Sequence, residues 1–468
     1  MTYRSSLAFL DGLVNYEKLA GPRNEFKLDN IRRLLELAGN PQRRMRNVIL
    51  VAGTKGKGSV CYMLEAALRG CGLSTGMFIS PHVLDVRERI QLDGKPIPKS
   101  LFANLVSRLA PFVSSVRPSS FVLRPDAVAV SYFEMTTAMA FLLFAERQPD
   151  YSVIEVGLGG RLDATNLSEP VVSVITRIGY DHLKVLGNTL TKIAGEKAGI
   201  MRKGRPVVIG EQEPEALAAL KRKARESGAR LVQAGSVVSV QSVADGLRLA
   251  ARCRFGTGVI RLPLLGQHQA ENCQTALAVL NELAVHDRCI RFSHVARGMG
   301  TVSIPARCQV VRRRSLIIVD SCHNPESGRA LANVLRDHLP HLRASIRPSS
   351  IVHRHSEKVI LVYGSLSGKL VAETVAPLAP FVERAVLVQP DNPRAMPLAE
   401  LESVFTSLHI PYVTADSVRS ALSLAQASSL SLQPSSLPVV VAGSFYLAGE
   451  ALKLLGPSRV ARGNLLLR

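Results

Sequence analysis

Short apolar runs alternate with longer segments of helical periodicity along most of the chain. The runs at residues 47–52 and 152–156 have no polar alternation, which is typical of strands buried on both faces of a sheet. Between them, residues 59–68 place apolar side chains on one helix face. This pattern predicts an α/β protein with open, mostly parallel sheets. The other predicted strands are residues 171–176, 206–209, 316–320, 359–363, 385–388 and 438–442.

Two such strand–helix systems follow each other, so we expect two doubly wound, mostly parallel-sheet domains. The first spans residues 1–298 and the smaller, Rossmann-like second spans residues 306–468. The segment between them, G-M-G-T-V-S-I-P-A-R at 298–307, has the glycine and proline of a linker. Residues 232–264 read as an inserted β-hairpin, and residues 343–357 and 428–438 read as variable loops.

Composition narrows the possible classes of protein. The 468 residues are 47% hydrophobic and 20% charged, and no apolar run reaches the roughly 18–20 residues of a membrane span. Seven cysteines without a C-x-x-C pair argue against a disulfide framework and a thiolate zinc site. The N-terminus lacks the apolar core of a secretory signal, so we expect a cytoplasmic protein. We also expect a monomer and no membrane partner.

The net charge of +21 raises the question of nucleic-acid binding. Basic residues are spread out, only 5% of residues are aromatic and there is no tryptophan, so stacking platforms are sparse. We therefore expect no nucleic-acid partner. The favoured interpretations are a basic surface without a specific partner, or one that attracts polyanionic small substrates.

The strongest chemical signal is N-V-I-L-V-A-G-T-K-G-K-G-S at residues 47–59. A strand enters a glycine-rich turn and then a helix, an arrangement that presents main-chain N–H groups to polyphosphate. Lys57 supplies a point charge for outer phosphates, and the hydroxyl of Thr54 or Ser59 suits Mg²⁺. The spacing departs from a standard Walker A loop, since Gly58 separates Lys57 from Ser59.

Further polar residues follow predicted strands, whose carboxyl ends face the ligand crevice in open α/β sheets. Glu155 ends an apolar strand and is a metal-ligand candidate, because a buried carboxylate needs a partner or a cation. Ser80 could serve the same cation. Physics alone favours a structural His182 over a ligand, since Mg²⁺ prefers oxygen. Asp320 and His323 follow a second-domain strand where Asn324 could equally cap a helix.

Together these motifs resemble the folylpolyglutamate synthase / dihydrofolate synthase family of the ATP-dependent Mur ligase superfamily. The resemblance spans roughly residues 20–450 and rests on G-T-K-G-K-G-S, S-P-H, E-V-G-L-G-G-R-L-D-A-T-N, I-G-Y-D-H, E-K-A-G-I, G-Q-H-Q-x-x-N, D-x-x-H-N-P and G-S-F-Y-L-A-G-E. It implies a P-loop-type ATPase domain at the N-terminus. It also implies a ligase that adds L-glutamate to dihydropteroate, or to the γ-carboxylate of folate polyglutamates, through an acyl phosphate.

The resemblance also implies roles for individual residues. The implied nucleotide-binding residues are Gly53, Thr54, Gly56, Lys57, Gly58, Ser59, Asn272, Arg307 and Asp320. The implied ligands of two Mg²⁺ ions are Ser59, Ser80, Glu155 and His182. The implied catalytic residues are Lys57, His182 and Lys197, the last matching a lysine that this family carbamylates. The implied substrate contacts are Asp163, Thr165, Asn166 and the segment 19–33 for the pterin, and His323 and Ser444 for the amino acid.

The chain departs from the family pattern at several positions. Ala306 replaces a linker glycine, Ser321–Cys322 replaces Gly-Ala, and Gly368–Leu370 replaces Asp-Lys-Asp. Two alternatives stay open at this point: another Mur-type amide ligase with a non-folate acceptor, and a nucleotide-binding protein that has lost ligation. The sequence does not separate dihydrofolate synthesis from tail extension, and one chain can do both.

Overall fold

The computed structural model describes residues 1–16, 27–113, 129–313, 315–346, 358–427 and 437–456. The chain divides into two compact units. The first comprises Met1–Ser239, Ala250–Ile260 and Glu271–Thr301, and the second comprises Val240–Leu249, Arg261–Ala270 and Val302–Arg468. The division between Thr301 and Val302 lies within the linker predicted from the sequence, and two earlier segments also belong to the second unit.

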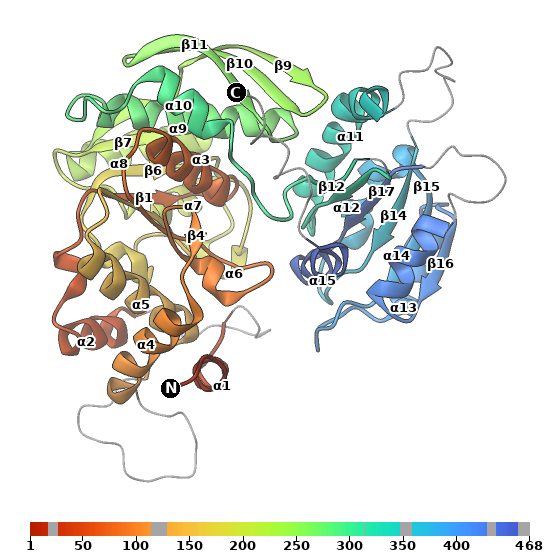
Figure 1. The fold of residues 1–468 in the computed structure, drawn as a ribbon, viewed down its shortest axis with the longest axis horizontal. Helices are drawn as coiled ribbons and strands as arrows, with labels where there is room; N and C mark the ends of the chain where they lie inside the picture. Colours follow the sequence, from red (N-terminus) through yellow and green to blue (C-terminus); the bar gives the residue numbers. More distant parts are fainter. Residues whose placement is uncertain (17–26, 114–128, 314, 347–357, 428–436, 457–468) are drawn as a thin grey trace. The chain divides into compact units, whose positions relative to one another are not determined.

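The first unit contains an eight-stranded sheet of order β4-β3-β2-β5-β1-β6-β7-β8 (Figure 1). The six strands from β2 to β8 in this order pair in parallel, and β3 and β4 form an antiparallel edge. Their bounds are β1 Val48–Ala52, β2 Thr75–Phe78, β3 Ile90–Leu92, β4 Lys95–Pro96, β5 Tyr151–Glu155, β6 Pro170–Ile175, β7 Pro206–Ile209 and β8 Arg230–Gln233. β1 has four strands on one side and three on the other. The turn after its carboxyl end therefore lies near the middle of one edge of the sheet.

Helices cover both faces of this sheet. Val48, Leu50 and Ala52 of β1 belong to a core shared with α2 Asp29–Leu37, α4 Lys99–Leu109, α5 Tyr132–Arg147, α7 Leu190–Ala198 and α8 Pro214–Ser227. Ile49 and Val51 point the other way, since side chains alternate along a strand. On that side α3 Lys57–Gly70 contacts β2 and β5 and packs against α10 Phe292–Met299. A run buried on both faces is therefore apolar throughout, as the sequence shows.

Further helices belong to the first part of the chain. They are α1 Tyr3–Asp11, α6 Leu183–Leu186 and α9 Gln267–Leu283, with the 3₁₀ helices η1 Pro41–Arg43, η2 Val86–Arg89, η3 Ala110–Phe112 and η4 Ala164–Leu167. The inserted strands predicted within 232–264 form a three-stranded sheet of order β11-β10-β9. Its strands are β9 Val237–Val243, β10 Gly246–Cys253 and β11 Gly256–Leu262.

The second unit contains a six-stranded sheet of order β12-β13-β17-β14-β15-β16, in which only β12 runs antiparallel. Its strands are β12 Gln309–Arg312, β13 Ile317–Val319, β14 Val359–Tyr363, β15 Val382–Val388, β16 Tyr412–Ala415 and β17 Val439–Ala442. Its helices are α11 Pro325–Ile346, α12 Val371–Val375, η5 Ala376–Phe381, α13 Leu398–Ser407, α14 Val418–Ala427 and α15 Phe445–Leu455. The protein is thus an α/β protein with mostly parallel sheets.

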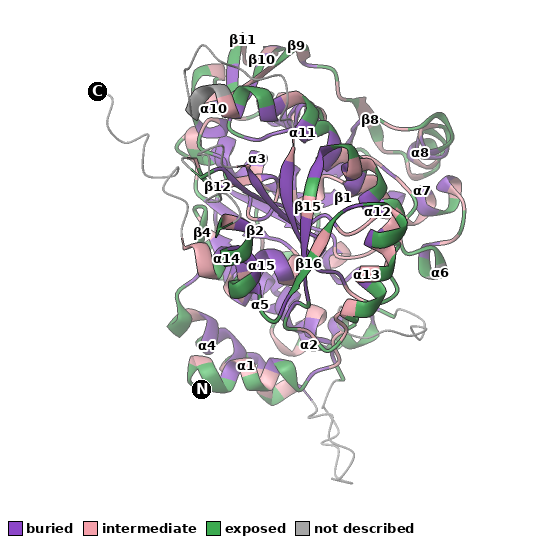
Figure 2. Ribbon diagram, turned by 90° about the vertical axis from the view of Figure 1, so that its right-hand side faces the viewer, coloured by how far each residue is buried: buried purple, intermediate pink, exposed green. Residues whose placement is uncertain are grey.

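All eight strands predicted from apolar runs are present, and most of their residues are buried. Figure 2 shows buried residues on the strands of the interior and exposed residues on the surrounding helices. The sequence analysis did not list the edge strands β8 and β16. Their residues are mostly exposed or half-buried, so their hydrophobic pattern carries little signal. In the described part of the chain, no helix is both long and apolar enough to cross a membrane.

Candidate functional site

The turn after β1 is shaped for close approach of a ligand to the main chain. Gly53 has φ +148°, and a Cβ there would lie 1.9 Å from Thr176 Oγ1. Gly56 has φ +85°, and a Cβ there would lie 2.1 Å from Asn272 Oδ1. Gly56 is also the N-cap of α3 and offers no side-chain cap. The first N–H groups of α3, together with the positive end of its dipole, are thereby left to bind an anion.

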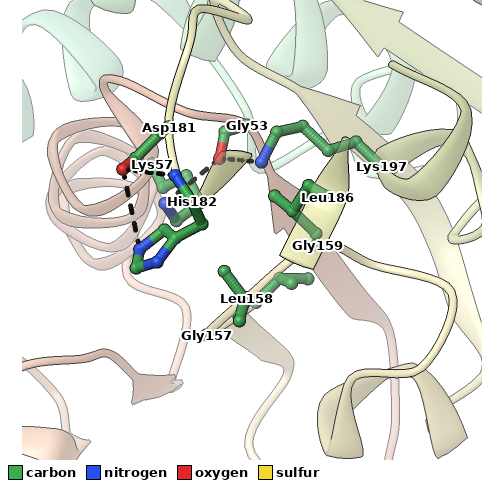
Figure 3. A pocket seen from close by; sticks show the side chains of 10 residues that line it. Gly53, Lys57, Gly157, Leu158, Gly159, Asp181, His182, Leu186 and Lys197 are labelled. Atoms are coloured by element: carbon green, nitrogen blue, oxygen red, sulfur yellow. Dashed lines mark hydrogen bonds and ion pairs between the residues drawn. The ribbon is translucent and has the colours of Figure 1, made fainter. Parts of the chain in front are cut away.

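Two lysines meet at the start of this turn. Lys57 Nζ and Lys197 Nζ donate to the same carbonyl oxygen of Gly53, at 3.1 Å and 2.8 Å (Figure 3). Lys197 comes from α7 and is only 3% exposed. Burial, and secondarily the nearby charge of Lys57, lowers the pKa of Lys197 to about 7. A substantial fraction of Lys197 is therefore the neutral, nucleophilic amine at neutral pH.

Glu155 lies beside the phosphate loop. It ends β5 opposite Val51 of β1 and is 5% exposed. Its Oε2 accepts the main-chain N–H of Ser80 at 3.0 Å, and a Cβ on Gly58 would lie 3.6 Å from the same oxygen. The carboxylate therefore lies next to the first turn of α3, which also carries the buried Ser59. Carboxylate and hydroxyl oxygens are the ligands that Mg²⁺ prefers.

His182 and Asp181 line a cavity together with Lys57 and Lys197 (Figure 3). His182 has φ +49°, and its Nε2 is 3.7 Å from Asp181 Oδ1. Burial by itself would raise the pKa of Asp181, but the charges of His182, Lys55, Lys57 and Lys197 hold it below its usual value. The cavity opens to solvent, and its roughly 280 Å³ of space free of protein atoms includes some of that solvent. It is lined by Gly53, Val156, Gly157, Leu158, Gly159 and Leu186, with Lys57, Asp181, His182 and Lys197.

Residues predicted from the sequence thus come together in space: Lys57, His182 and Lys197 line one cavity, and Glu155 lies next to the phosphate loop. No site role was predicted for Asp181, Gly157 or Gly159. The G-L-G-G motif and the position of Asp181 after a buried strand were the available signals. No group of three or more His, Cys, Asp or Glu that could hold a metal occurs among the described residues.

The predicted pterin residues follow residues 156–159, which line this cavity. In the structure their side chains hydrogen-bond to the surrounding main chain. The Asp163 carboxylate accepts the N–H of Leu158 at 2.8 Å and both the N–H and the hydroxyl of Thr165. Burial raises the pKa of Asp163 despite these hydrogen bonds. Asn166 Nδ2 donates to the carbonyls of Arg161 and Gly199. Substrate contact by these residues stays a prediction, and residues 19–26 lie outside the described residues.

In the second unit, the predicted nucleotide residues organise the loop after β13. Asp320 accepts the N–H of Cys308 and of Cys322, both at 2.7 Å, so its carboxylate ties the two loops together. All seven cysteines belong to the described residues and none forms a disulfide. Asn324 caps a helix, one of the two roles that the sequence left open. Its Oδ1 accepts the N–H of Ser327 at 2.9 Å, at the start of α11.

Arg307, His323 and Ser444 gather around Phe445 at the start of α15. The Arg307 guanidinium lies 5.0 Å from the Phe445 ring centre, and the His323 ring lies 5.6 Å from it. Ser444 is 2% exposed and caps α15 by accepting the N–H of Leu447 at 3.1 Å. These residues therefore lie together within the second unit. Their binding of nucleotide or amino acid stays a prediction.

The departures from the family pattern at Ala306, Ser321 and residues 368–370 all lie among the described residues. Ala306, where the family has glycine, is fully buried at φ +53°, a left-handed conformation that disfavours a Cβ. Ser321, also in a glycine place, accepts a hydrogen bond from Arg307 at 2.6 Å. At 368–370, Gly368 has φ +79° and Leu370 is 58% exposed. Ser321 thus adds an acceptor for Arg307 that glycine cannot provide.

The fold and the cavity define a class: an α/β protein that binds nucleotide at a glycine-rich turn beside a buried carboxylate. Residues 93–280 match the Mur ligase middle domain family. The folylpolyglutamate synthase of Lacticaseibacillus casei is 31% identical over 97% of this chain and 99% of that protein. The dihydrofolate synthase/folylpolyglutamate synthase of Mycobacterium tuberculosis is 32% identical over 92% of this chain and 90% of that protein.

A solved structure of M. tuberculosis folylpolyglutamate synthase complexed with ADP and AMPPCP covers 97% of this chain and 99% of that chain, with a TM-score of 0.82 and 31% identity. The chain belongs to the folylpolyglutamate synthase / dihydrofolate synthase family. It is an ATP-dependent glutamate ligase of that family.

Proposed function

We propose that this enzyme adds L-glutamate to dihydropteroate, to the γ-carboxylate of (tetrahydro)folate polyglutamates, or to both. The acceptor carboxylate attacks the γ-phosphorus of ATP, ADP leaves, and the amine of glutamate then displaces phosphate from the acyl phosphate. The observation that carries the proposal is the pairing of two lysines on Gly53 beside the buried Glu155. Related proteins of solved structure hold ADP with DHPP, or AMPPCP with folate.

Lys57 and the first turn of α3 would bind the transferred phosphoryl group. In the structure Lys57 donates to Gly53, a neutral partner that an anionic phosphate oxygen can replace. Gly56 and Gly58 leave the main chain open, and Asn272 Oδ1 lies against Gly56. A lysine held at this place neutralises charge as the phosphoryl group moves.

The residues around the loop fit the two Mg²⁺ ions that we propose. Ser59, Ser80 and Glu155 would supply oxygen donors, and His182 lines the neighbouring cavity with Lys57. When bound, Mg²⁺ would neutralise phosphate charge and orient the phosphoryl group. The buried Glu155 carboxylate has the charge and position that such an ion requires.

We propose that Lys197 reacts with carbon dioxide. Its neutral amine would form an N–C bond to CO₂ and release one proton, which leaves an anionic carbamate. The low pKa of about 7 and the nearby Lys57 ammonium both favour that change of charge. Carbamylation is tested by a ¹³C NMR carbamate resonance after incubation with ¹³C-bicarbonate, which should be absent from Lys197→Met. No carbamate signal in the unmodified enzyme would contradict this part of the proposal.

The second unit would supply nucleotide contacts from Arg307 and Asp320 and the glutamate site around His323 and Ser444. The cluster of Arg307, His323 and Ser444 around Phe445 supports this assignment. Asp320 lies in the neighbouring loop, where it accepts the N–H groups of Cys308 and Cys322. The cationic Arg307 and the histidine suit anionic ligands such as phosphate and the carboxylates of glutamate. We also propose a cytoplasmic, monomeric enzyme, as the sequence analysis expects.

The test is ADP release by the purified enzyme with ATP, Mg²⁺ and L-glutamate, with dihydropteroate and with tetrahydrofolate in turn. Release should require both glutamate and one of these acceptors. Lys57→Met should reduce the rate at least about a hundredfold, as expected for loss of a phosphate-neutralising group. Lys192→Met, at an exposed position, is the control and should retain activity. ADP release that needs neither acceptor nor glutamate would favour the alternatives.

A further inference from the structure

Residues 176–178, which follow β6, hydrogen-bond to the main chain of the phosphate loop. The carbonyl oxygen of Arg177 accepts the N–H of Thr54 at 3.0 Å and the N–H of Lys55 at 3.1 Å. Thr176 N–H donates to Ala52 O at 2.9 Å, at the point where β1 ends. The orientation of the main chain just before Gly56 therefore depends on the position of one carbonyl group, that of Arg177.

Gln212 brackets this carbonyl from both sides. It lies in the loop between β7 and α8, and its Oε1 accepts the N–H of Ile178 at 2.9 Å. Its Nε2 donates to the carbonyl of Thr176 at 3.0 Å, with a longer contact of 3.5 Å to Ile175 O. One side-chain amide thus bonds to the peptide groups before and after Arg177. Both its donor and its acceptor are used to hold three residues of main chain.

The side chain of Arg177 adds ion pairs, but they are the weaker restraint. Its guanidinium lies 2.8 Å from Glu213 and 3.6 Å from Glu271. All three side chains are at least 36% exposed, so solvent screens these pairs. The two hydrogen bonds of Gln212 to the main chain are less easily replaced, because an unpaired N–H or carbonyl beside the sheet costs free energy.

We propose that Gln212 is a positioning residue for nucleotide binding, which it supports through residues 176–178 and the phosphate loop. This inference rests on the proposed role of that loop in binding ATP. Without Gln212 the Arg177 carbonyl loses its fixed position, and the N–H groups of Thr54 and Lys55 lose a fixed acceptor. The glycine turn then samples more conformations, so nucleotide affinity falls while the rate of the bound complex changes little.

The main variant is Gln212→Met, which keeps the length of the side chain and removes both hydrogen bonds. Gln212→Glu is the second variant, since it retains an acceptor for Ile178 N–H and loses the donor. The matched control is Gln148→Met. Gln148 Nε2 also donates to two main-chain carbonyls, those of Arg44 at 2.8 Å and Ala145 at 2.7 Å, at the end of α5.

We expect Gln212→Met to raise KM for ATP about tenfold, the effect of losing two modest hydrogen bonds. Gln212→Glu should give an intermediate value, and kcat and KM for glutamate should stay within about twofold. Hydrogen exchange of a peptide covering residues 53–59 should become faster in the nucleotide-free Gln212 variants. Gln148→Met should change neither quantity. Unchanged KM for ATP and unchanged exchange in both Gln212 variants would overturn the inference, as would equal effects in the control.

Direct binding of AMPPCP, which keeps a γ-phosphoryl group, separates this inference from the proposed function. If Lys57→Met weakens AMPPCP binding and both Gln212 variants bind it as the unmodified enzyme does, the positioning role is wrong and the loop assignment stands. If Lys57→Met binds AMPPCP normally, the loop assignment itself fails. The hydrogen-exchange rate of residues 53–59 reports on the phosphate loop without any need for turnover. If Gln212→Met does not fold, this rate is measured in Gln212→Glu instead.

Discussion

Lys197→Met should raise the free energy of unfolding of the nucleotide-free protein. The same substitution should abolish its activity. Lys197 is 3% exposed, and its ordinary pKa of 10.5 is lowered to about 7 in the fold. Each pKa unit is worth about 1.4 kcal/mol, so the protonated lysine costs the fold roughly 5 kcal/mol at pH 6. Methionine removes this cost, although it also gives up the hydrogen bond to Gly53, worth about 1–3 kcal/mol.

The pH dependence gives the sharper number. Between pH 7 and pH 10.5 the unfolded chain binds more protons at Lys197 than the fold does, so the stability of the unmodified protein rises with pH in this window. Below pH 7 both states are protonated and the cost is fully present. The stability advantage of Lys197→Met should therefore shrink by about 3 kcal/mol from pH 6 to pH 9.

The assay is urea unfolding of the nucleotide-free protein in CO₂-free buffer at pH 6, 7.5 and 9. Lys192→Met is the matched control, because Lys192 lies on the same helix but is exposed. Its effect should not change with pH. If Lys197→Met is equally stabilising at pH 6 and pH 9, or destabilising at pH 6, the reasoning about a buried, destabilised ammonium is refuted.

Three further substitutions test the loops. Gly56→Ala should reduce ADP affinity more than about a hundredfold in a fluorescence titration, since φ +85° and a Cβ 2.1 Å from Asn272 Oδ1 are both unfavourable; tight binding would show that the turn can adjust. Ala306→Gly should raise the free energy of unfolding by about 0.5–1 kcal/mol in urea, because it relieves the left-handed alanine; a loss of stability would contradict this. Ser321→Gly should raise KM for ATP about fivefold as Arg307 loses its acceptor, and an unchanged KM would detach Ser321 from nucleotide binding.

The sequence by itself determined the class of fold and most of the elements. The first-unit strands β1, β5, β6 and β7 are short apolar runs because both sheet faces are covered, and that burial is written directly in the residue pattern. The glycine turn at 53–58 is equally local, since the need for positive φ selects glycine whatever the surroundings. Edge strands such as β16 carry no such pattern and emerged only in the structure.

The tertiary structure decided which groups meet and in which protonation state. The sequence distinguishes Lys197 only through its resemblance to a family motif, and it is burial beside Lys57 in the fold that lowers its pKa. Asp163 and Asn166 are polar residues of a conspicuous motif, and only their hydrogen bonds reveal that they hold the turn itself. Gln212 is 159 residues from Gly53 in the chain (212 − 53), so no local pattern connects them. Solvation and charge depend on distances in space, which a linear pattern of residues does not contain.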